Sequence, residues 1–327
     1  MAVRIDGYFD RNFGDDYMIK TVLEHFPEVA FVINDTMGLS EMLRGLENVK
    51  ISDEETEKTL RVIGSGFMVN SPEAFITELL WLIKGKKEPG WCIGCSLEPF
   101  KNFLFEWVIR KKLEKYELIT ARDKKSYEWL KKNCKRARVE YFPDIVFAAD
   151  IKEPSKKGDG LGISVMNLGF EEKYESYYAS LAKVADYYIE TTGKDVLLLA
   201  FDAGEENDKV ACSHVKSLMR NKEAQIIVHG SENEIINAYS ECGRIIGTRF
   251  HSAVLALKMG IDLYPVIYRH KMSGLLSDIG FWGKSSPVEK PDLEGMKEFL
   301  REGCGYTLPD EYANKAKGHF DVLKELL

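Results

Sequence analysis

Apolar runs of strand length alternate along this chain with longer stretches whose apolar residues recur at helical spacing. Residues 3–9 (VRIDGYF) are predicted to form a strand and 10–16 a turn, and residues 17–26 place Met18, Val22 and Phe26 on one helical face. Further strands are predicted at 29–33, 60–66, 90–94, 116–121 and 138–142, with helix-like stretches between them. Alternation of this kind predicts a mainly parallel sheet with helices on its faces.

The pattern breaks at residues 151–160 (IKEPSKKGDG), where proline, glycine and mixed charge indicate an interdomain linker. Alternation then restarts, with strands predicted at 161–167, 195–201, 224–229, 244–247 and 262–268 and helices at 171–191, 207–220, 232–242 and 252–259. The predicted fold is therefore α/β, with two Rossmann-like parallel-sheet domains facing each other across a cleft in a GT-B-like arrangement.

The predicted boundaries are residues 1–150 for an acceptor-side domain and 160–309 for a donor-side domain. Residues 310–327 are expected to form a terminal helix on which Phe320, Leu323 and Leu327 share one face, so that the helix packs, with the first domain as the candidate surface. A length of 327 residues suits two such cores.

Charge and hydropathy exclude several classes of protein. A net charge of −7 argues against a nucleic-acid binder that neutralises phosphates with a basic face. The amino-terminal residues MAVRIDGYFD lack a signal-peptide core, so a cytoplasmic location is expected. The most apolar stretch, residues 75–83 (FITELLWLI), is short and contains Glu78, which predicts a buried helix rather than a membrane span. Peripheral contact with a membrane stays open.

The stretch WCIGC at 91–95 resembles a thioredoxin redox motif, but Pro99 follows where that motif would continue as a helix. Zinc would need two more ligands at a matching spacing. Cys92 and Cys95 are better explained as small apolar residues at a strand end.

The loop before the helix at 252–259 places Arg249 and His251 two positions apart. Ser252 is a plausible N-cap and Gly260 a plausible left-handed end of that helix. Because unpaired N–H groups and the positive end of the helix dipole gather at a helix start, an arginine there favours binding of an anion. A surface arginine with a histidine that bonds a backbone carbonyl is the competing explanation.

Other loops that follow strands carry polar residues too. Asn12, Gly14 and Asp15 lie between the first strand and helix without matching a P-loop or a dinucleotide fingerprint, and could equally form a plain capped turn. Arg122 ends a strand beside Asp123, and two arginines on opposite cleft walls could bracket one dianion, unless Arg122 and Asp123 form a local ion pair. A capping box from Ser231 to Glu234 opens the helix at 232–242, which is predicted to end on Gly243.

An acidic loop contains Asp202, Glu206 and Asp208. Solvated residues at a helix start explain these carboxylates better than a metal site does, and no metal is expected.

Six segments in order resemble the polysaccharide pyruvyl transferase family across roughly positions 3 to 281. They are GYFDRNFGDD, ITARDKKS, YFPDIVF, LGISVMN, SENEIINAYSECGRIIGTRFHSAVLALKMGI and YPVIYRHKMSGLLSDIGF. The resemblance implies transfer of an enolpyruvyl unit from phosphoenolpyruvate, as co-substrate and without a cofactor, to a sugar or lipid-linked glycan acceptor. His251, Arg249 and Asp15 would be catalytic. The expected substrate-binding residues are Asn12, Gly14, Arg122, Asn167, Ser231, Glu232 and Lys271.

Two other functions fit the same architecture. A GT-B-type glycosyltransferase or a nucleotide-sugar enzyme would bind a nucleotide diphosphate at helix amino ends in the second domain. A non-catalytic carbohydrate-binding relative is suggested by residues 64–70 (GSGFMVN) and 94–99 (GCSLEP), which depart from the glycine-rich stretches usual in the family.

Overall fold

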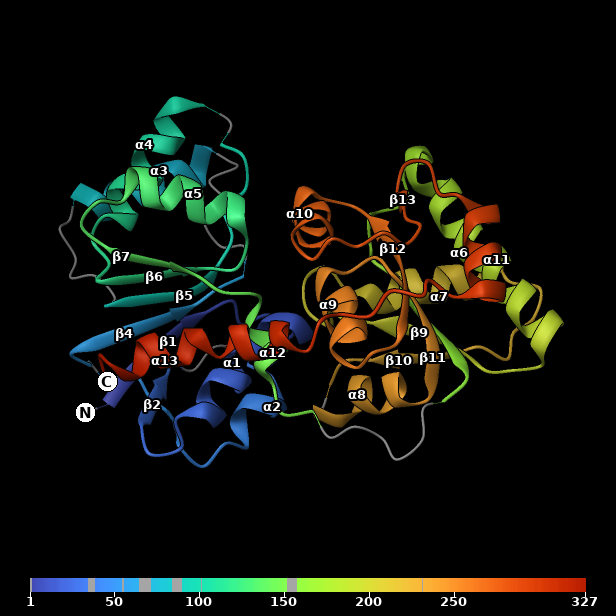
Figure 1. Cartoon of the computed structure of the whole chain (residues 1–327), viewed down its shortest axis with the longest axis horizontal. Helices are drawn as coiled ribbons and strands as arrows, with labels where there is room; N and C mark the ends of the chain where they lie inside the picture. Colours follow the sequence, from blue (N-terminus) through green and yellow to red (C-terminus); the bar gives the residue numbers. More distant parts are fainter. Residues whose placement is uncertain are drawn as a thin grey trace.

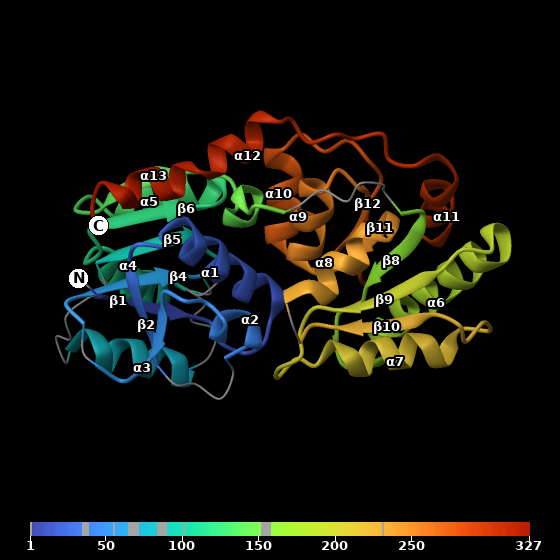
Figure 2. The ribbon, with the colours of Figure 1, turned by 90° about the horizontal axis from the view of Figure 1, so that it is seen from below.

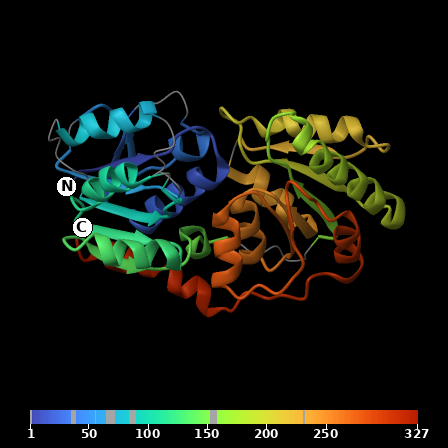
Figure 3. The ribbon, with the colours of Figure 1, turned by 90° about the horizontal axis from the view of Figure 1, so that it is seen from above.

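A computed structural model describes residues 2–34, 39–54, 56–64, 72–83, 90–100, 102–151, 158–230 and 232–327. The chain forms two parallel-sheet domains side by side (Figures 1 and 3). The sheet of the first domain has seven strands in the order β3-β2-β1-β4-β5-β6-β7. Their bounds are β1 Ala2–Gly7, β2 Ala30–Ile33, β3 Val49–Ile51, β4 Lys58–Val62, β5 Trp91–Cys95, β6 Leu118–Ala121 and β7 Arg138–Tyr141.

Helices cover both faces of the first sheet. α1 (Phe13–His25) and α2 (Glu41–Arg44) lie below it in Figure 1, whereas α3 (Pro72–Ile83), α4 (Phe103–Leu113) and α5 (Lys124–Asn133) lie above it. A short 3₁₀ helix, η1 (Ile145–Ala148), follows β7. The strands are buried on both sides, as β5 shows, because every one of its residues is enclosed.

The second domain repeats this architecture with six strands in the order β10-β9-β8-β11-β12-β13. The strands are β8 Gly160–Ser164, β9 Val196–Ala200, β10 Gln225–Val228, β11 Cys242–Gly247, β12 Asp262–Ile267 and β13 Ser286–Pro287. The helices are α6 Glu172–Thr192, α7 Asp208–Leu218, α8 Glu232–Ser240, α9 Phe250–Lys258, α10 His270–Asp278 and α11 Leu293–Glu302. The prediction of two Rossmann-like domains in a GT-B-like fold is confirmed.

The last residues return to the first domain. They form two helices, α12 (Glu311–Ala316) and α13 (Gly318–Lys324), rather than the single helix expected, and run beneath the first sheet (Figures 1 and 2). Phe320 and Leu323 are buried there, and Leu327 packs against the same core, as predicted. His319 is enclosed between Thr120 at 2.6 Å and the carbonyl of Pro143 at 2.8 Å.

The hydrogen bonds of His319 fix its tautomer. A carbonyl can only accept, so Nε2 donates to Pro143 and Nδ1 accepts from the Thr120 hydroxyl. Burial lowers the pKa of His319 to about 4, so the ring is neutral at physiological pH. The chain end is thus attached to the first domain by packing and by a neutral hydrogen-bonded ring.

Several local predictions are wrong. α1 begins at Phe13, inside the predicted turn, because Asn12 caps it by accepting from the N–H of Gly14 at 3.1 Å. Ser252 is not the N-cap of α9, which begins at Phe250 after Arg249. α8 ends at Ser240 and not at Gly243, which lies inside β11. Gly260 does adopt the left-handed conformation expected after α9, with φ of 61°.

The helix predicted to be buried at 75–83 is instead half covered. Ile76 and Leu80 of α3 are exposed, because α3 lies on the outer layer and turns one face away from the sheet. Cys92 and Cys95 are buried free thiols in β5, which confirms their packing role. Among the described residues, no helix is long and apolar enough to cross a membrane.

Candidate active site

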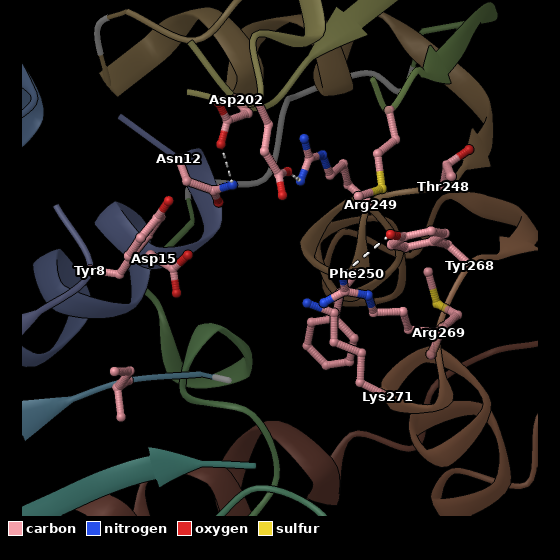
Figure 4. Close-up of a pocket in the computed structure, with 14 residues that line it drawn as sticks. Tyr8, Asn12, Asp15, Asp202, Thr248, Arg249, Phe250, Tyr268, Arg269 and Lys271 are labelled. Carbon is pink, nitrogen blue, oxygen red and sulfur yellow. Dashed lines mark hydrogen bonds and ion pairs between the residues drawn. The ribbon is translucent and has the colours of Figure 1, made fainter. Parts of the chain in front are cut away.

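Loops that follow β1, β6, β8, β9, β11 and β12 meet where the two domains face each other. They enclose a cavity of about 230 Å³, and a second cavity of about 40 Å³ shares part of its lining. Residues from both domains line both cavities, and Figure 4 shows the larger one. The shared residues are Asn12, Asp15, Arg249, Phe250 and Lys271.

Arg122, Phe201 and His251 complete the lining of the smaller cavity. Six of the side chains predicted for the site therefore gather at one point: Asn12, Asp15, Arg122, Arg249, His251 and Lys271. They come from both domains, as expected for a ligand site between the carboxyl ends of two parallel sheets.

Arg249 lines the cavity from the start of α9, but carboxylates hold its guanidinium. Asp208 accepts from Nε at 2.8 Å and from Nη2 at 2.6 Å, and Glu206 pairs with Nη1. Burial disfavours the charged form, but the two carboxylates outweigh it and raise the pKa of Arg249. The charge of Arg249 is largely offset within its own domain.

Two of the three residues of the acidic loop are therefore not solvated, whereas the side chain of Glu206 is 45% exposed, as predicted. Asp202 and Asp208 are buried, and each carboxylate accepts from backbone N–H groups of the surrounding loops. The loop folds inward because Arg249 and these N–H groups replace water around the carboxylates. Among the described residues, no group of three His, Cys, Asp or Glu side chains could hold a metal ion.

A second buried ion pair joins Arg122 to Asp144, which sequence reasoning did not single out. Nη1 of Arg122 lies 2.7 Å from Oδ2 of Asp144, and both side chains are almost fully buried. Burial raises the pKa of the Asp144 carboxyl, but Arg122 and His251 outweigh it and hold that pKa below its usual range. The guanidinium also lies over the Phe250 ring, 4.3 Å from its centroid.

His251 reaches this ion pair from the other domain. Its Nε2 lies 3.7 Å from Oδ2 of Asp144 and 3.4 Å from Nη1 of Arg122. Asp144 and Arg122 therefore both lie against Nε2 and hold the orientation of the ring. An imidazole with an adjacent carboxylate is an arrangement that suits general acid or base chemistry.

Gly14 lies directly against the ring of His251. A Cβ added at Gly14 would be 1.8 Å from Nδ1, so no other residue fits without moving α1 away from α9. The ring therefore crosses the domain boundary and touches both walls of the cleft. The contact with His251 by itself requires a glycine at position 14, independently of the substrate-binding role predicted for Gly14.

Asn12 joins the two domains through its side chain and its backbone. Its amide nitrogen donates to Asp202 at 3.0 Å while its oxygen caps α1. The backbone adds an antiparallel bridge between Asn12 and Asp202 and a bond from the N–H of Phe13 to the carbonyl of Phe201 at 2.8 Å. Asn12 thereby fixes the relative position of the two walls at the edge of the larger cavity (Figure 4).

Lys271 enters the cavity from the first turn of α10. Its ammonium lies 5.7 Å from the centroid of Phe250. Burial is the main cause that lowers the pKa of Lys271 to about 8, and the neighbouring cations, Arg122 foremost, act in the same direction while Asp15 opposes them. A cation under this repulsion would gain from the arrival of an anion.

The remaining predicted residues lie elsewhere. Asn167 donates to the carbonyl of Glu206 at 2.7 Å and supports the acidic loop from behind, outside the described lining of either cavity. Ser231 lies outside the described residues, as does the side chain of Glu232, the first residue of α8.

Sequence reasoning also missed several residues of the site. The aromatic rings of Tyr8 and Tyr268 and the cation of Arg269 line the larger cavity. Asp16 and His229 form a fully buried pair between the domains, with Oδ2 and Nε2 2.9 Å apart. Asp144 had a detectable signal, since it is the one charge in the otherwise apolar and aromatic segment YFPDIVF. The pairing of Asp16 with His229 joins positions too distant in sequence to be linked by pattern.

Comparison with known proteins gives one family. A model of the family described as polysaccharide pyruvyl transferase matches residues 12–270. The amylovoran biosynthesis protein AmsJ of Erwinia amylovora is 23% identical over 254 residues, which cover 69% of this chain and 60% of that protein. The chain therefore aligns with less than two thirds of the length of this relative.

Solved structures show the fold. The UDP-GlcNAc 2-epimerase of Methanocaldococcus jannaschii superposes with a TM-score of 0.59 at 9% identity, covering 99% of both chains. A putative UDP-N-acetylglucosamine 2-epimerase of Listeria monocytogenes gives 0.60 at 10% identity, covering 99% of this chain and 95% of that one. Anabaena Alr3699/HepE, solved with UDP and glucose, gives 0.54 at 10% identity, with 99% and 94% covered. At these identities the likeness concerns the two-domain fold alone.

Proposed function

The chain belongs to the polysaccharide pyruvyl transferase family, and we propose that it acts in polysaccharide biosynthesis by transferring the enolpyruvyl unit of phosphoenolpyruvate to a glycan as a ketal. The observation that carries this proposal is the gathering of Arg122, Lys271 and His251 around one interdomain cavity. The donor has a phosphate and a carboxylate, so its site needs cations beside a proton-transfer group.

The chemistry assigns a role to each side chain. Lys271 and Arg122 attract the two anionic groups of the donor, and Arg249 lies beside them. His251, oriented by Asp144, delivers a proton to the methylene carbon, which becomes a methyl group and leaves an oxocarbenium-like centre at the neighbouring carbon. A sugar hydroxyl attacks that centre and loses its proton to Asp15. Phosphate then departs with its bonding electrons and leaves a second oxocarbenium-like centre at the same carbon. A second hydroxyl of the same sugar attacks this centre, gives its proton to the neutral His251 and closes the ketal.

The acceptor in this proposal is a sugar or a lipid-linked glycan. The larger cavity suits it because Tyr8 and Tyr268 present aromatic rings, while the exposed carboxylate of Glu206 presents hydrogen-bond acceptors. Aromatic faces and carboxylates are the groups with which proteins commonly hold sugar rings and hydroxyls. In this arrangement the donor occupies the smaller cavity and the acceptor the larger one, and the two meet at the residues that line both cavities.

The test measures phosphate released from phosphoenolpyruvate with a panel of glycan acceptors, and ketal formation by mass spectrometry. His251→Ala should reduce turnover by roughly 10²–10⁴-fold with little change in donor affinity. Lys183→Ala, on the outer surface of α6, is the matched control and should behave as wild type. Turnover unchanged by His251→Ala would contradict the assignment of the proton donor.

A second measurement separates this function from nucleotide-sugar chemistry. Phosphoenolpyruvate at 100 times its Kd should raise the free energy of unfolding by about 2.7 kcal/mol, which a thermal scan detects as a higher melting temperature. UDP-sugars should leave the melting temperature unchanged. Stabilisation by UDP-sugars alone would favour the alternative of a glycosyltransferase or a nucleotide-sugar enzyme. Donor binding without phosphate release across the acceptor panel would favour a non-catalytic relative.

A further inference from the structure

The outer surface of the first domain exposes large apolar side chains where α4 begins. Phe103, Leu104 and Trp107 are 75%, 49% and 45% exposed. Trp107 lies four positions after Phe103 and three after Leu104, so it shares one face of the helix with both. Apolar clusters of this kind on a protein surface mark a site of interaction.

The neighbouring helix α3 adds to this apolar surface. Ile76 and Leu80, one turn apart, are exposed there. Contacts between the two helices use other side chains, with the rings of Phe75 and Phe105 5.0 Å apart and Lys112 paired with Glu78 at 2.7 Å. The inner sides of α3 and α4 therefore pack within the domain while their outer sides expose apolar residues to water.

The segment beside this surface is rich in positive charge. Residues 110–138 contain twelve Lys or Arg and four Asp or Glu, in a chain whose net charge is −7. Arg122 is buried in the cleft and Lys112 is buried against Glu78, and the other ten cations are exposed or partly exposed. On α5, Trp129 donates to Glu106 of α4 at 3.0 Å, so this side of α5 faces α4. Lys125 and Lys132 are four positions before and three positions after Trp129, on the same side of α5, and both are exposed.

We propose that the outer surface of α3, α4 and α5 binds an anionic lipid bilayer, with the apolar residues entering the interface and the lysines contacting lipid headgroups. Amphipathic surfaces that combine aromatic residues with Lys and Arg bind membranes in this way. The local charge, opposite in sign to that of the whole chain, favours a negatively charged membrane over a second copy of this acidic protein.

The geometry gives this binding a consequence for the cleft. α4 starts after the carboxyl end of β5, the same edge of the sheet at which the cavities lie. Docking through the first turn of α4 would hold the mouth of the cleft near the membrane surface, where a lipid-linked molecule is confined. The binding itself does not depend on which reaction the cleft performs.

The experiment is flotation of the full chain with vesicles of phosphatidylglycerol and phosphatidylcholine, compared with pure phosphatidylcholine vesicles. Wild type should bind the anionic vesicles more tightly, and added salt should weaken that binding. Phe103→Glu with Trp107→Glu should weaken it about tenfold or more, by removing the apolar insertion. Lys125→Glu with Lys132→Glu should weaken it at least about 25-fold, since each lysine near an anionic surface contributes about fivefold.

Matched controls lie on the second domain. Phe170→Glu with Trp282→Glu alters equally exposed aromatic residues, and Lys183→Glu with Lys209→Glu makes the same charge change on α6 and α7. Both controls should bind vesicles as wild type does. No binding of wild type to anionic vesicles, or equal loss in the control variants, would overturn the proposal. Self-association that Phe103→Glu with Trp107→Glu abolishes, in the absence of vesicle binding, would identify a second copy as the occupant instead.

Discussion

The two walls of the cleft each present an arginine, but the arginines have different surroundings. Arg122 of the first domain meets one carboxylate, Asp144, and both are enclosed. Arg249 of the second domain meets two, and Glu206 is 45% exposed. The first wall therefore carries a balanced buried pair shared with His251, whereas the second carries an excess of negative charge around its arginine.

This difference shows that position in a loop does not determine how a cation acts. Arg249 was expected from sequence to be a principal anion ligand, and its guanidinium is already engaged by Asp208 and Glu206. Arg122 donates to one carboxylate through Nη1, and the same nitrogen lies 3.4 Å from Nε2 of His251, the proton donor in the proposed reaction. Four experiments distinguish the two walls.

The largest expected effect follows removal of Asp144. Asp144→Ala should lower the free energy of unfolding by about 3–5 kcal/mol, because Arg122 would remain buried without its carboxylate. Glu206→Ala, on the exposed side of the other cluster, should cost at most about 1 kcal/mol. Urea unfolding monitored by fluorescence measures both. Equal losses would show that burial does not separate the two clusters.

Charge-preserving changes come next. Arg122→Lys should weaken phosphoenolpyruvate binding by about 10–100-fold, since an ammonium cannot bond Asp144 and a donor at once as a guanidinium can. Arg249→Lys should have a smaller effect, because its charge is offset by two carboxylates. Calorimetric titration gives the affinities. Solution scattering of wild type and Arg122→Lys, with and without donor, would show whether the donor closes the domains, and full affinity in Arg122→Lys would place that residue outside the site.

A steric change tests the contact between the walls. Gly14→Ala should destabilise the protein by about 1–3 kcal/mol and impair turnover, because its Cβ would overlap the His251 ring. Gly274→Ala in α10, where nothing lies within 4 Å of the added Cβ, should be neutral or slightly stabilising. Thermal unfolding and the phosphate-release assay measure both changes. A fully active Gly14→Ala variant would mean that the walls need not touch during catalysis.

The smallest expected effect is the pH dependence of donor affinity. The pKa of Lys271 is lowered to about 8, so its positive charge, complete below that pH, is lost as pH rises through 8. Affinity for phosphoenolpyruvate should therefore fall above pH 8 by up to about tenfold per unit, while the donor phosphate, with a second pKa near about 6, stays fully ionised. Titrations between pH 7 and pH 9.5 should show no such fall in Lys271→Met.

Sequence patterns predicted the fold well where burial is complete. β5, β8 and β9 are enclosed on both faces, so their apolar runs were easily recognised. The short edge strands β3 and β13 were missed because three and two residues give too little pattern. The start of α1 was missed because its cap at Asn12 also serves an interdomain bond, which no local pattern records.

The candidate site was predicted in part for the same physical reason. Asp15, Arg122, Arg249, His251 and Lys271 follow strands and therefore had to gather at the cleft. The ion pairs of the two arginines could not be predicted, because Asp144 pairs with Arg122, and Asp208 with Arg249, only through tertiary contacts. The residue types alone predicted the charge of each side chain. They did not predict how far neighbouring carboxylates offset that charge in the folded protein.

The chain end that attaches to the first domain affects the order in which the two domains can complete their folding. Thr120 and the carbonyl of Pro143 form hydrogen bonds with His319, which leaves the ribosome after the second domain has been synthesised. Part of the core of the first domain is therefore expected to stay uncovered until residues 310–327 are in place. Residues 1–150 made alone should be cut rapidly by protease and be protected once residues 310–327 are supplied in the same chain. Division at the linker would therefore separate two sheets but not two independently complete folding units.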